Sequence, residues 1–321
     1  MNRQSAVDLT TLGETLAVLA PDHIGPLRHA RSLGLTVAGS ESTVAIGVRR
    51  LGHSAAWAGR VGDDELGRLV TDRLRGEDLR VHAVTDASAP TGLFLKDQPL
   101  AGSRRVHYYR GGSAGSHLCP EDLPPGVVEG SRVVHTSGIT SALSDAAART
   151  VRTALARARS VGVTVSFDLN HRTRLWSDER ARTELWQVVP LVDLLFASDD
   201  EAALLVPEAG GDPERAAHAL REHGPETVVV TMGAAGSLSV GPEGVRLGAA
   251  PAVLEVDPIG AGDSFVAGYL SAFLDGCAEP ERLVRASAVA AVCVATQGDW
   301  EGLPDRAVLE LALAPAGTVT R

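Results

Sequence analysis

Asp263 follows a glycine-rich turn in the stretch VDPIGAGDSFVAGYLSAFLDG, residues 256–276, which continues as an apolar, helix-like run. An aspartate here can cap the helix, because its side chain accepts hydrogen bonds from unpaired N–H groups of the first turn. The same helix start can instead bind an anion through the amides of Gly260, Ala261 and Gly262. A carboxylate beside bound phosphate is then explained if Asp263 takes the proton of a hydroxyl that attacks phosphorus. The segment by itself leaves both interpretations open.

Two further groups of polar residues could bind a sugar or an anion. If SRRVHYYRGGS, residues 103–113, forms a strand, Tyr108 and Arg110 share one face, where the guanidinium could grip a carboxylate. Arg172 in DLNHRTRLW could bind a phosphate or a carboxylate, and Asp299 in QGDWEG could bind sugar hydroxyls or cap a turn. A surface ribbon and ordinary surface loops are the alternatives. The histidines lack metal-ligand spacing and GxSxG is absent, so neither a zinc protease nor a serine hydrolase is indicated.

The C-terminal two thirds of the chain predict the scaffold for these side chains, a parallel sheet flanked by helices. The apolar runs that predict strands span residues 132–138, 161–170, 192–198 and 226–233. The amphipathic stretches between them span residues 144–160, 178–190 and 213–224. Ligands bind beyond the carboxyl ends of such strands, so we expect the polar groups that follow them to line a site. These are Asp168, Asn170, Arg172, Ser198, Glu201, Thr231 and Gly233.

The N-terminal third predicts a small β-sheet inserted into this core. Its segments are short, partly alternating and separated by Gly, Pro and Ser. They occupy about residues 14–38 and 91–111, within a single α/β domain of residues 1–321. Between them, residues 42–52 and 63–77 predict helices on either side of a core strand at 55–62.

Composition narrows the possible partners. The formal net charge of −10 disfavours a nucleic acid or an acidic membrane surface. No apolar run approaches the roughly 18 residues that span a bilayer, and Asp8 and Glu14 disfavour a signal peptide. The 3 cysteines are widely spaced, which fits a reducing compartment. We therefore expect a cytoplasmic protein with a small-molecule partner.

The only lysine of the chain is Lys96, in GLFLKDQPL. It does not lie in the GxxxxGK[ST] pattern of a P-loop, so P-loop kinases and ATPases are excluded. A Schiff-base enzyme would have to use Lys96, and nothing in its sequence context indicates this. The GAGD turn also fails as a dinucleotide fingerprint, because Phe265 stands where GxGxxG requires Gly or Ala.

Taken in order, these segments resemble the ribokinase-like (PfkB-type) carbohydrate kinases over almost the whole chain. AGSESTVAIGVRRLG with GRVGDDELGRLV is similar to the family's N-terminal signature, and DPIGAGDSFVAGYL to its C-terminal one. YYRGGSAGS and DLNHRTRLWS are most similar to the branch of 2-keto-3-deoxygluconate kinases. The resemblance implies a doubly wound, Rossmann-like, mainly parallel sheet with a small inserted β-sheet lid, often used for contacts in a homo-oligomer.

The resemblance also implies ATP and Mg²⁺, with a monovalent cation left open, and phosphorylation of the terminal hydroxyl of 2-keto-3-deoxygluconate to the 6-phosphate. Asp263 would be the base, and Gly260, Ala261 and Gly262 would neutralise the charge that develops. Glu201 would act on the metal indirectly, through water. The residues that match the sugar site are Gly39, Thr43, Phe94, Tyr108, Arg110, Arg172 and Asp299. Those that match the nucleotide site are Asn170, Arg172, Ser198, Thr231, Gly233, Gly236, Gly260 and Gly262.

The chain departs from the family pattern mainly where the sugar is recognised. Ala38 replaces the first glycine of a Gly-Gly pair, Thr43 replaces an asparagine, and Phe94 lacks an expected hydroxyl. Thr231 stands where lysine is common, and Ser198 replaces the asparagine of an NxxE element. A fructokinase or ribokinase acting on a neutral sugar is therefore the nearest alternative. A non-catalytic sugar or nucleotide sensor and a dinucleotide oxidoreductase are more distant ones.

Overall fold

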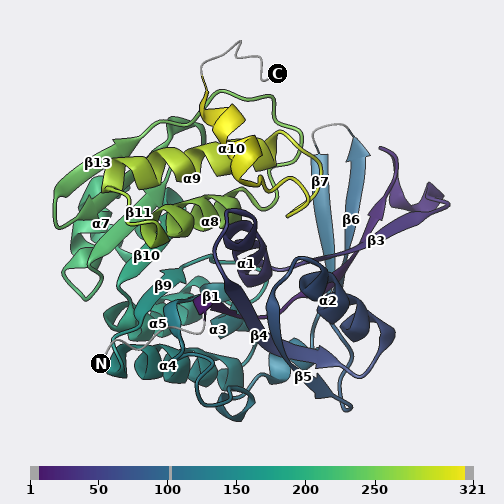
Figure 1. The fold of residues 1–321 in the computed structure, drawn as a ribbon. Helices are drawn as coiled ribbons and strands as arrows, with labels where there is room; N and C mark the ends of the chain where they lie inside the picture. Colours follow the sequence, from purple (N-terminus) through teal and green to yellow (C-terminus); the bar gives the residue numbers. More distant parts are fainter. Residues whose placement is uncertain (1–6, 101–102, 315–321) are drawn as a thin grey trace.

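The computed structural model describes residues 7–100 and 103–314, which are organised around a nine-stranded sheet (Figure 1). The strand order is β13-β12-β11-β10-β9-β8-β1-β4-β5; the pairs β11–β12 and β12–β13 are antiparallel, and all the other pairs are parallel. The strands are β1 (Val7–Leu12), β4 (Ala55–Gly62), β5 (Arg80–Asp86), β8 (Ser131–Ser137), β9 (Thr164–Asp168), β10 (Leu194–Ser198), β11 (Thr227–Thr231), β12 (Ser237–Gly241) and β13 (Gly244–Gly248). The predicted doubly wound α/β fold is confirmed.

Helices cover both faces of this sheet (Figure 1). One face carries α4 (Asp145–Ser160), α5 (Asp178–Val188), α6 (Asp199–Leu205) and α7 (Pro213–Arg221). The other carries α1 (Ser40–Arg50), α2 (Glu65–Gly76), α8 (Ala261–Leu274), α9 (Glu279–Val294) and α10 (Arg306–Leu313). Neighbouring residues of β10 enter different cores, Leu195 on the α4 side and Phe196 on the α8 side, because strand side chains alternate. Within the described ranges, no helix is long and apolar enough to cross a membrane.

Short helical segments complete the connections. The helix α3 (Gly138–Leu143) directly follows β8. The 3₁₀ segments are η1 (Leu27–His29), η2 (Ala114–His117), η3 (Pro120–Asp122), η4 (Val189–Leu191), η5 (Pro207–Ala209) and η6 (Gly233–Ala235).

A second sheet of four strands projects from one side of the main sheet (Figure 1). We call it the small sheet; its order is β3 (Leu33–Ala38), β2 (Leu16–Pro21), β6 (Leu93–Leu100) and β7 (Ser103–Tyr109). Leu16, Val18, Ala38 and Phe94 form its own buried cluster. The predicted inserted β-sheet is thereby confirmed as part of the fold.

The order of the main sheet reverses beside β1. From β1 the chain continues to β4 and β5 on one side, and it then returns to β8 and β9 on the other. Loops that leave neighbouring strands in opposite directions open a crevice at their carboxyl ends. The ends of β1, β8 and β9 and the start of α1 therefore frame the expected position of a site.

Candidate active site

The GAGD turn begins α8 in a conformation that requires glycine. Gly260 is the N-cap, with φ +83°, and a Cβ there would lie 2.5 Å from the carbonyl oxygen of Asp299. No side-chain hydrogen bond caps α8, and Asp263 lies inside its first turn. The interpretation of Asp263 as the N-cap is therefore wrong. The first N–H groups of α8 can face an anion instead, which fits a phosphate group.

Asp263 is held by residues from two other elements. The hydroxyl of Ser40, at the start of α1, donates to Oδ1 of Asp263 at 2.5 Å. The side-chain amide of Asn170, just after β9, donates to the same oxygen at 3.3 Å and to Ser40 Oγ at 3.0 Å. Burial raises the pKa of Asp263, opposed by the Ser40 hydrogen bond and the Arg172 charge. The result is an oriented carboxylate whose proton affinity is above that of an ordinary aspartate.

The Ser40→Ala variant is expected to shift the pH dependence of catalysis. As the predicted base, Asp263 can accept a proton only when it is ionised, so activity is expected to fall as the pH falls through its pKa. The Ser40 hydrogen bond lowers that pKa, and its removal should move the acid limb of kcat/KM to higher pH. The pH profile of ADP release measures this. Ser42→Ala is the matched control, because Ser42 donates to the carbonyl of Gly39 and not to Asp263. An unmoved acid limb, or a shift to lower pH, contradicts the prediction.

Two more carboxylates lie near Asp263. Asp168 is buried, and burial, then Glu201 and then Asp263, raise its pKa. Glu201 is fixed by two backbone N–H groups, from His171 to Oε1 at 2.6 Å and from Ser198 to Oε2 at 2.8 Å. The mutual repulsion of these carboxylates would be relieved by a cation, and oxygen donors suit Mg²⁺.

No group of three or more metal-ligating His, Cys, Asp or Glu side chains occurs in the ranges that the structure describes. Magnesium usually needs no such protein cage, because it keeps waters and binds substrate phosphates through one or two carboxylates. The residues present thus fit a magnesium ion that is bound mainly by nucleotide. The prediction that Glu201 acts on the metal indirectly, through water, stays a prediction.

One cavity between the small sheet and the main sheet brings the predicted sugar-site residues together. All seven line it: Gly39, Thr43, Phe94, Tyr108, Arg110, Arg172 and Asp299. Asp263 and Gly260 line the same cavity, so the carboxylate and the predicted phosphate-binding turn reach the same space. The ring centroids of Phe94 and Tyr108 are 5.5 Å apart, which places an aromatic wall on the small-sheet side.

A neighbouring cavity is lined by three arginines, Arg110, Arg172 and Arg174. It shares Tyr108, Arg110, Ile139 and Arg172 with the first cavity, so the two adjoin. None of the described residues that line it is acidic. This cavity therefore favours a negatively charged group, while Asp263 lines only the adjoining one.

Glu14 is a site residue that the sequence analysis missed. Its Oε2 accepts hydrogen bonds from Arg110 Nε at 2.8 Å and Nη2 at 2.5 Å, and Ser113 donates to Oε1. The side chains of Glu14 and Arg110 are only 1% and 10% exposed, so this is a buried ion pair. Arg110 is thus oriented by the protein before any ligand binds. The only signal in the sequence was a charged residue at the end of an apolar run.

The predicted nucleotide residues lie at the same edge of the main sheet, outside the sugar cavity except for Arg172 and Gly260. Ser198 and Thr231 end the paired strands β10 and β11 and face each other in register. Gly236 has φ +99°, and a Cβ there would lie 2.2 Å from the carbonyl oxygen of Gly248. The binding of a nucleotide at this edge and the roles of the individual residues stay predictions.

The comparisons with known proteins agree on one family. Residues 8–306 match the model of the pfkB family carbohydrate kinases. A 2-dehydro-3-deoxygluconokinase of Thermoproteus tenax is 36% identical over 306 residues, covering 94% of this chain and 92% of the relative. A 2-dehydro-3-deoxygalactonokinase of Haloferax volcanii is 36% identical over 296 residues, covering 91% of this chain and 92% of the relative. A fructokinase of Klebsiella pneumoniae is 34% identical over 265 residues, covering 81% and 82%.

Solved structures have the same fold. The PfkB protein from Polaromonas sp. JS666 superimposes with a TM-score of 0.86 at 34% identity, covering 95% of this chain and 99% of that one. A candidate ribokinase II from E. coli, in complex with ATP and Mg²⁺, gives a TM-score of 0.88 at 25% identity, covering 95% and 98%.

Proposed function

Because the chain belongs to the PfkB family of carbohydrate kinases and is an ATP-dependent sugar kinase, we propose that its substrate is 2-keto-3-deoxygluconate, also called 2-dehydro-3-deoxygluconate. The product would be the 6-phosphate. The cavity that is lined by three arginines carries this proposal, because it favours a carboxylate and adjoins the cavity that contains Asp263. Relatives that are named for this sugar acid and its galactonate counterpart support the same class of substrate.

In the proposed complex, Tyr108, Arg110 and Arg172 hold the acid end of the sugar. The terminal hydroxyl then lies at Asp263, whose Oδ1 is held by Ser40 and Asn170, so we infer that Oδ2 takes the proton. Bound ATP with Mg²⁺ supplies the phosphoryl group and its counter-charge. The N–H groups at the start of α8 stabilise negative charge that develops during transfer, and the fixed geometry of the site supplies most of the remaining acceleration.

The proposal includes Mg²⁺ near Asp168 and Glu201, with Glu201 acting through water, and a cytoplasmic location. It also includes a homo-oligomer formed through the small sheet. Apolar and aromatic side chains on its surface support this, since Leu33, Leu35 and Tyr109 are 38%, 46% and 61% exposed. Sedimentation of the purified chain tests the assembly.

A panel of acceptors tests the substrate. We expect ADP release with 2-keto-3-deoxygluconate and a lower kcat/KM with fructose and ribose. The difference should be on the order of 10- to 100-fold, since a charge-assisted hydrogen bond contributes about 1.5–3 kcal/mol. The galactonate epimer belongs in the panel, because the two acids differ only in stereochemistry. Equal or greater kcat/KM with a neutral sugar would show a fructokinase or ribokinase instead.

A further inference from the structure

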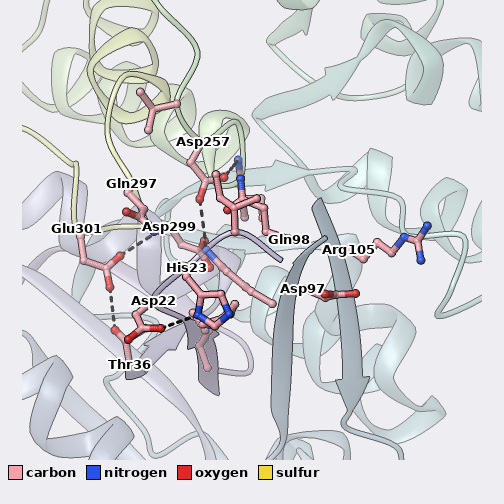
Figure 2. Close-up of a pocket in the computed structure, with 18 residues that line it drawn as sticks. Asp22, His23, Thr36, Asp97, Gln98, Arg105, Asp257, Gln297, Asp299 and Glu301 are labelled. Atoms are coloured by element: carbon pink, nitrogen blue, oxygen red, sulfur yellow. Dashed lines mark hydrogen bonds and ion pairs between the residues drawn. The ribbon is translucent and has the colours of Figure 1, made fainter. Parts of the chain in front are cut away.

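Two larger cavities adjoin the sugar cavity, and they differ in charge. One, of about 610 Å³, lies between the small sheet and residues 256–259 and 297–301 (Figure 2), and it shares Ile259 and Asp299 with the sugar cavity. Five carboxylates line it: Asp22, Asp97, Asp257, Asp299 and Glu301. The other, of about 720 Å³, is lined by Arg110, Arg172 and Arg174, and we call it the arginine cavity. The acid end of a bound sugar is therefore favoured in the arginine cavity and not in the first one.

The charge of Arg110 is already offset by the protein. Its Nε and Nη2 atoms both donate to Oε2 of Glu14, and its guanidinium lies over the ring of Tyr108, 5.7 Å from the ring centroid. An arginine can hold a carboxylate by two parallel hydrogen bonds from one edge of the guanidinium. Glu14 occupies the Nε–Nη2 edge of Arg110, and the pair carries no net charge. Arg110 can thus offer a ligand oriented N–H groups of Nη1, but little net attraction for an anion.

The charge of Arg172 already acts on the catalytic carboxylates. Burial raises the pKa of Asp168 and of Asp263, and the positive charge of Arg172 opposes this rise in both. Arg172 lines the arginine cavity and also the sugar cavity, which Asp263 lines too. Part of its attraction for an added anion is therefore cancelled by these two aspartates.

Arg174 differs from the other two arginines. It lines the arginine cavity and not the sugar cavity. Its Nη1 atom donates to the carbonyl of Val106 at 2.6 Å, and this neutral acceptor leaves the positive charge uncompensated. In the parts of the chain that the structure describes, no carboxylate pairs with Arg174, and no acceptor bonds its Nε or Nη2 atom. The edge that Glu14 occupies on Arg110 is thus open on Arg174.

The bond to Val106 also fixes the position of this open edge. Val106 lies on β7, an edge strand of the small sheet, and it lines the sugar cavity. Tyr108 lies two residues further along the same strand, and Arg172 lies two residues before Arg174. Arg174 is therefore anchored among the residues that are proposed to hold the acid end of the sugar, before any ligand binds.

We propose that Arg174 is a specificity-determining residue of this sugar kinase, which favours acids over neutral sugars by pairing its Nε–Nη2 edge with the carboxylate of the substrate. The inference rests on the proposed sugar-acid substrate. Arg110 and Arg172 position the acid end, and Arg174 supplies the uncompensated charge. The carboxylate does not react in phosphoryl transfer, so Arg174 contributes equally to the bound substrate and to the transition state. Its loss then raises KM and leaves kcat nearly unchanged.

Two acceptors that differ only at the acid group test the proposal. They are 2-keto-3-deoxygluconate and 3-deoxyfructose, which has a hydroxymethyl group in place of the carboxylate. Arg174→Met should raise KM for the acid on the order of 10- to 100-fold, with kcat within about threefold of wild type, since a charge-assisted pair is lost. Its kcat/KM with 3-deoxyfructose should change less than about threefold. Arg174→Lys keeps the charge without the two-bond edge, so its KM for the acid should lie between wild type and Arg174→Met.

Arg182→Met is the matched control. Arg182 is also exposed and also donates to a backbone carbonyl, that of Leu204 at 3.1 Å, but it lines neither cavity. It should leave the kinetics with both acceptors unchanged. The inference is overturned if Arg174→Met keeps the wild-type KM for the acid, or if it loses as much kcat/KM with 3-deoxyfructose as with the acid. A wild type that uses 3-deoxyfructose at least as well as the acid instead overturns the proposed substrate, and this inference with it.

Discussion

The Asp263→Asn variant is expected to lose about 10²–10⁴-fold in kcat, the usual contribution of a positioned general base. The substitution keeps the shape of the side chain, and its remaining oxygen can still accept hydrogen bonds from Ser40 and Asn170. An amide cannot take the proton of the attacking hydroxyl. Binding of ATP and sugar should therefore change little while turnover nearly stops. Single-turnover formation of ADP measures the transfer step, and calorimetric titration measures binding.

The stability of the same variant provides an internal check. Burial and the Glu201 charge disfavour ionised Asp263, so the neutral amide should leave the free energy of unfolding unchanged or higher. Asp200→Asn, an exposed change near the start of α6, is the control for loss of one carboxylate. If wild type and Asp263→Asn release ADP at equal rates, the chain does not use this base; if neither releases ADP, a sugar or nucleotide sensor becomes the better explanation.

The Arg110→Ala variant is expected to destabilise the fold by about 3–5 kcal/mol, because it leaves Glu14 buried without its cation. The same change removes a group proposed to bind the sugar acid, so loss of activity alone would not identify the cause. Urea unfolding of Arg110→Ala, Glu14→Gln and the double variant separates the two contributions. The double variant should regain much of the stability, because the buried charge is gone, without regaining kcat/KM for the sugar acid.

Arg180→Ala is the matched control for this cycle. Arg180 pairs with Asp145 on the surface, where the two side chains are 51% and 85% exposed. An exposed pair of this kind contributes at most about 1 kcal/mol. If Arg110→Ala destabilises the protein no more than Arg180→Ala does, the buried ion pair is not important for the fold.

The sequence predicted those parts of the protein that are determined by short, continuous stretches of the chain. Continuous apolar runs placed β8 to β11, and the strand at residues 55–62 was placed at its observed bounds. The sugar-site residues could be named because they stand in short motifs, and the cavity contains all of them. One interpretation based on a short stretch of sequence, the N-cap role of Asp263, was wrong. Aspartate is a favoured N-cap, yet Gly260 takes that position, because the left-handed backbone there excludes side chains.

The ion pairs of the site could not be predicted from a single sequence. Glu14 and Arg110 are separated by 96 residues, and Lys96 and Asp299 by 203. No periodicity or spacing connects such residues, since the folding of the small sheet onto the main sheet brings them together. Neither charged residue stands in a recognisable motif: Glu14 lies in the short connection between β1 and β2, and Lys96 lies within β6.

Of the four chain passages that join the small sheet to the main domain, three line the proposed sugar cavity, and Gly92 in the fourth packs against Glu14 and Arg110. Glu14 precedes β2, Gly39 follows β3, Gly92 precedes β6 and Arg110 follows β7. Any hinge motion of the small sheet has to bend the chain at these positions, and the Glu14–Arg110 pair joins the first passage to the last. Three of the four positions that would bend thus also line the proposed sugar cavity. An opened molecule would have no preformed sugar site, so capture of the sugar and closure over it would be a single event.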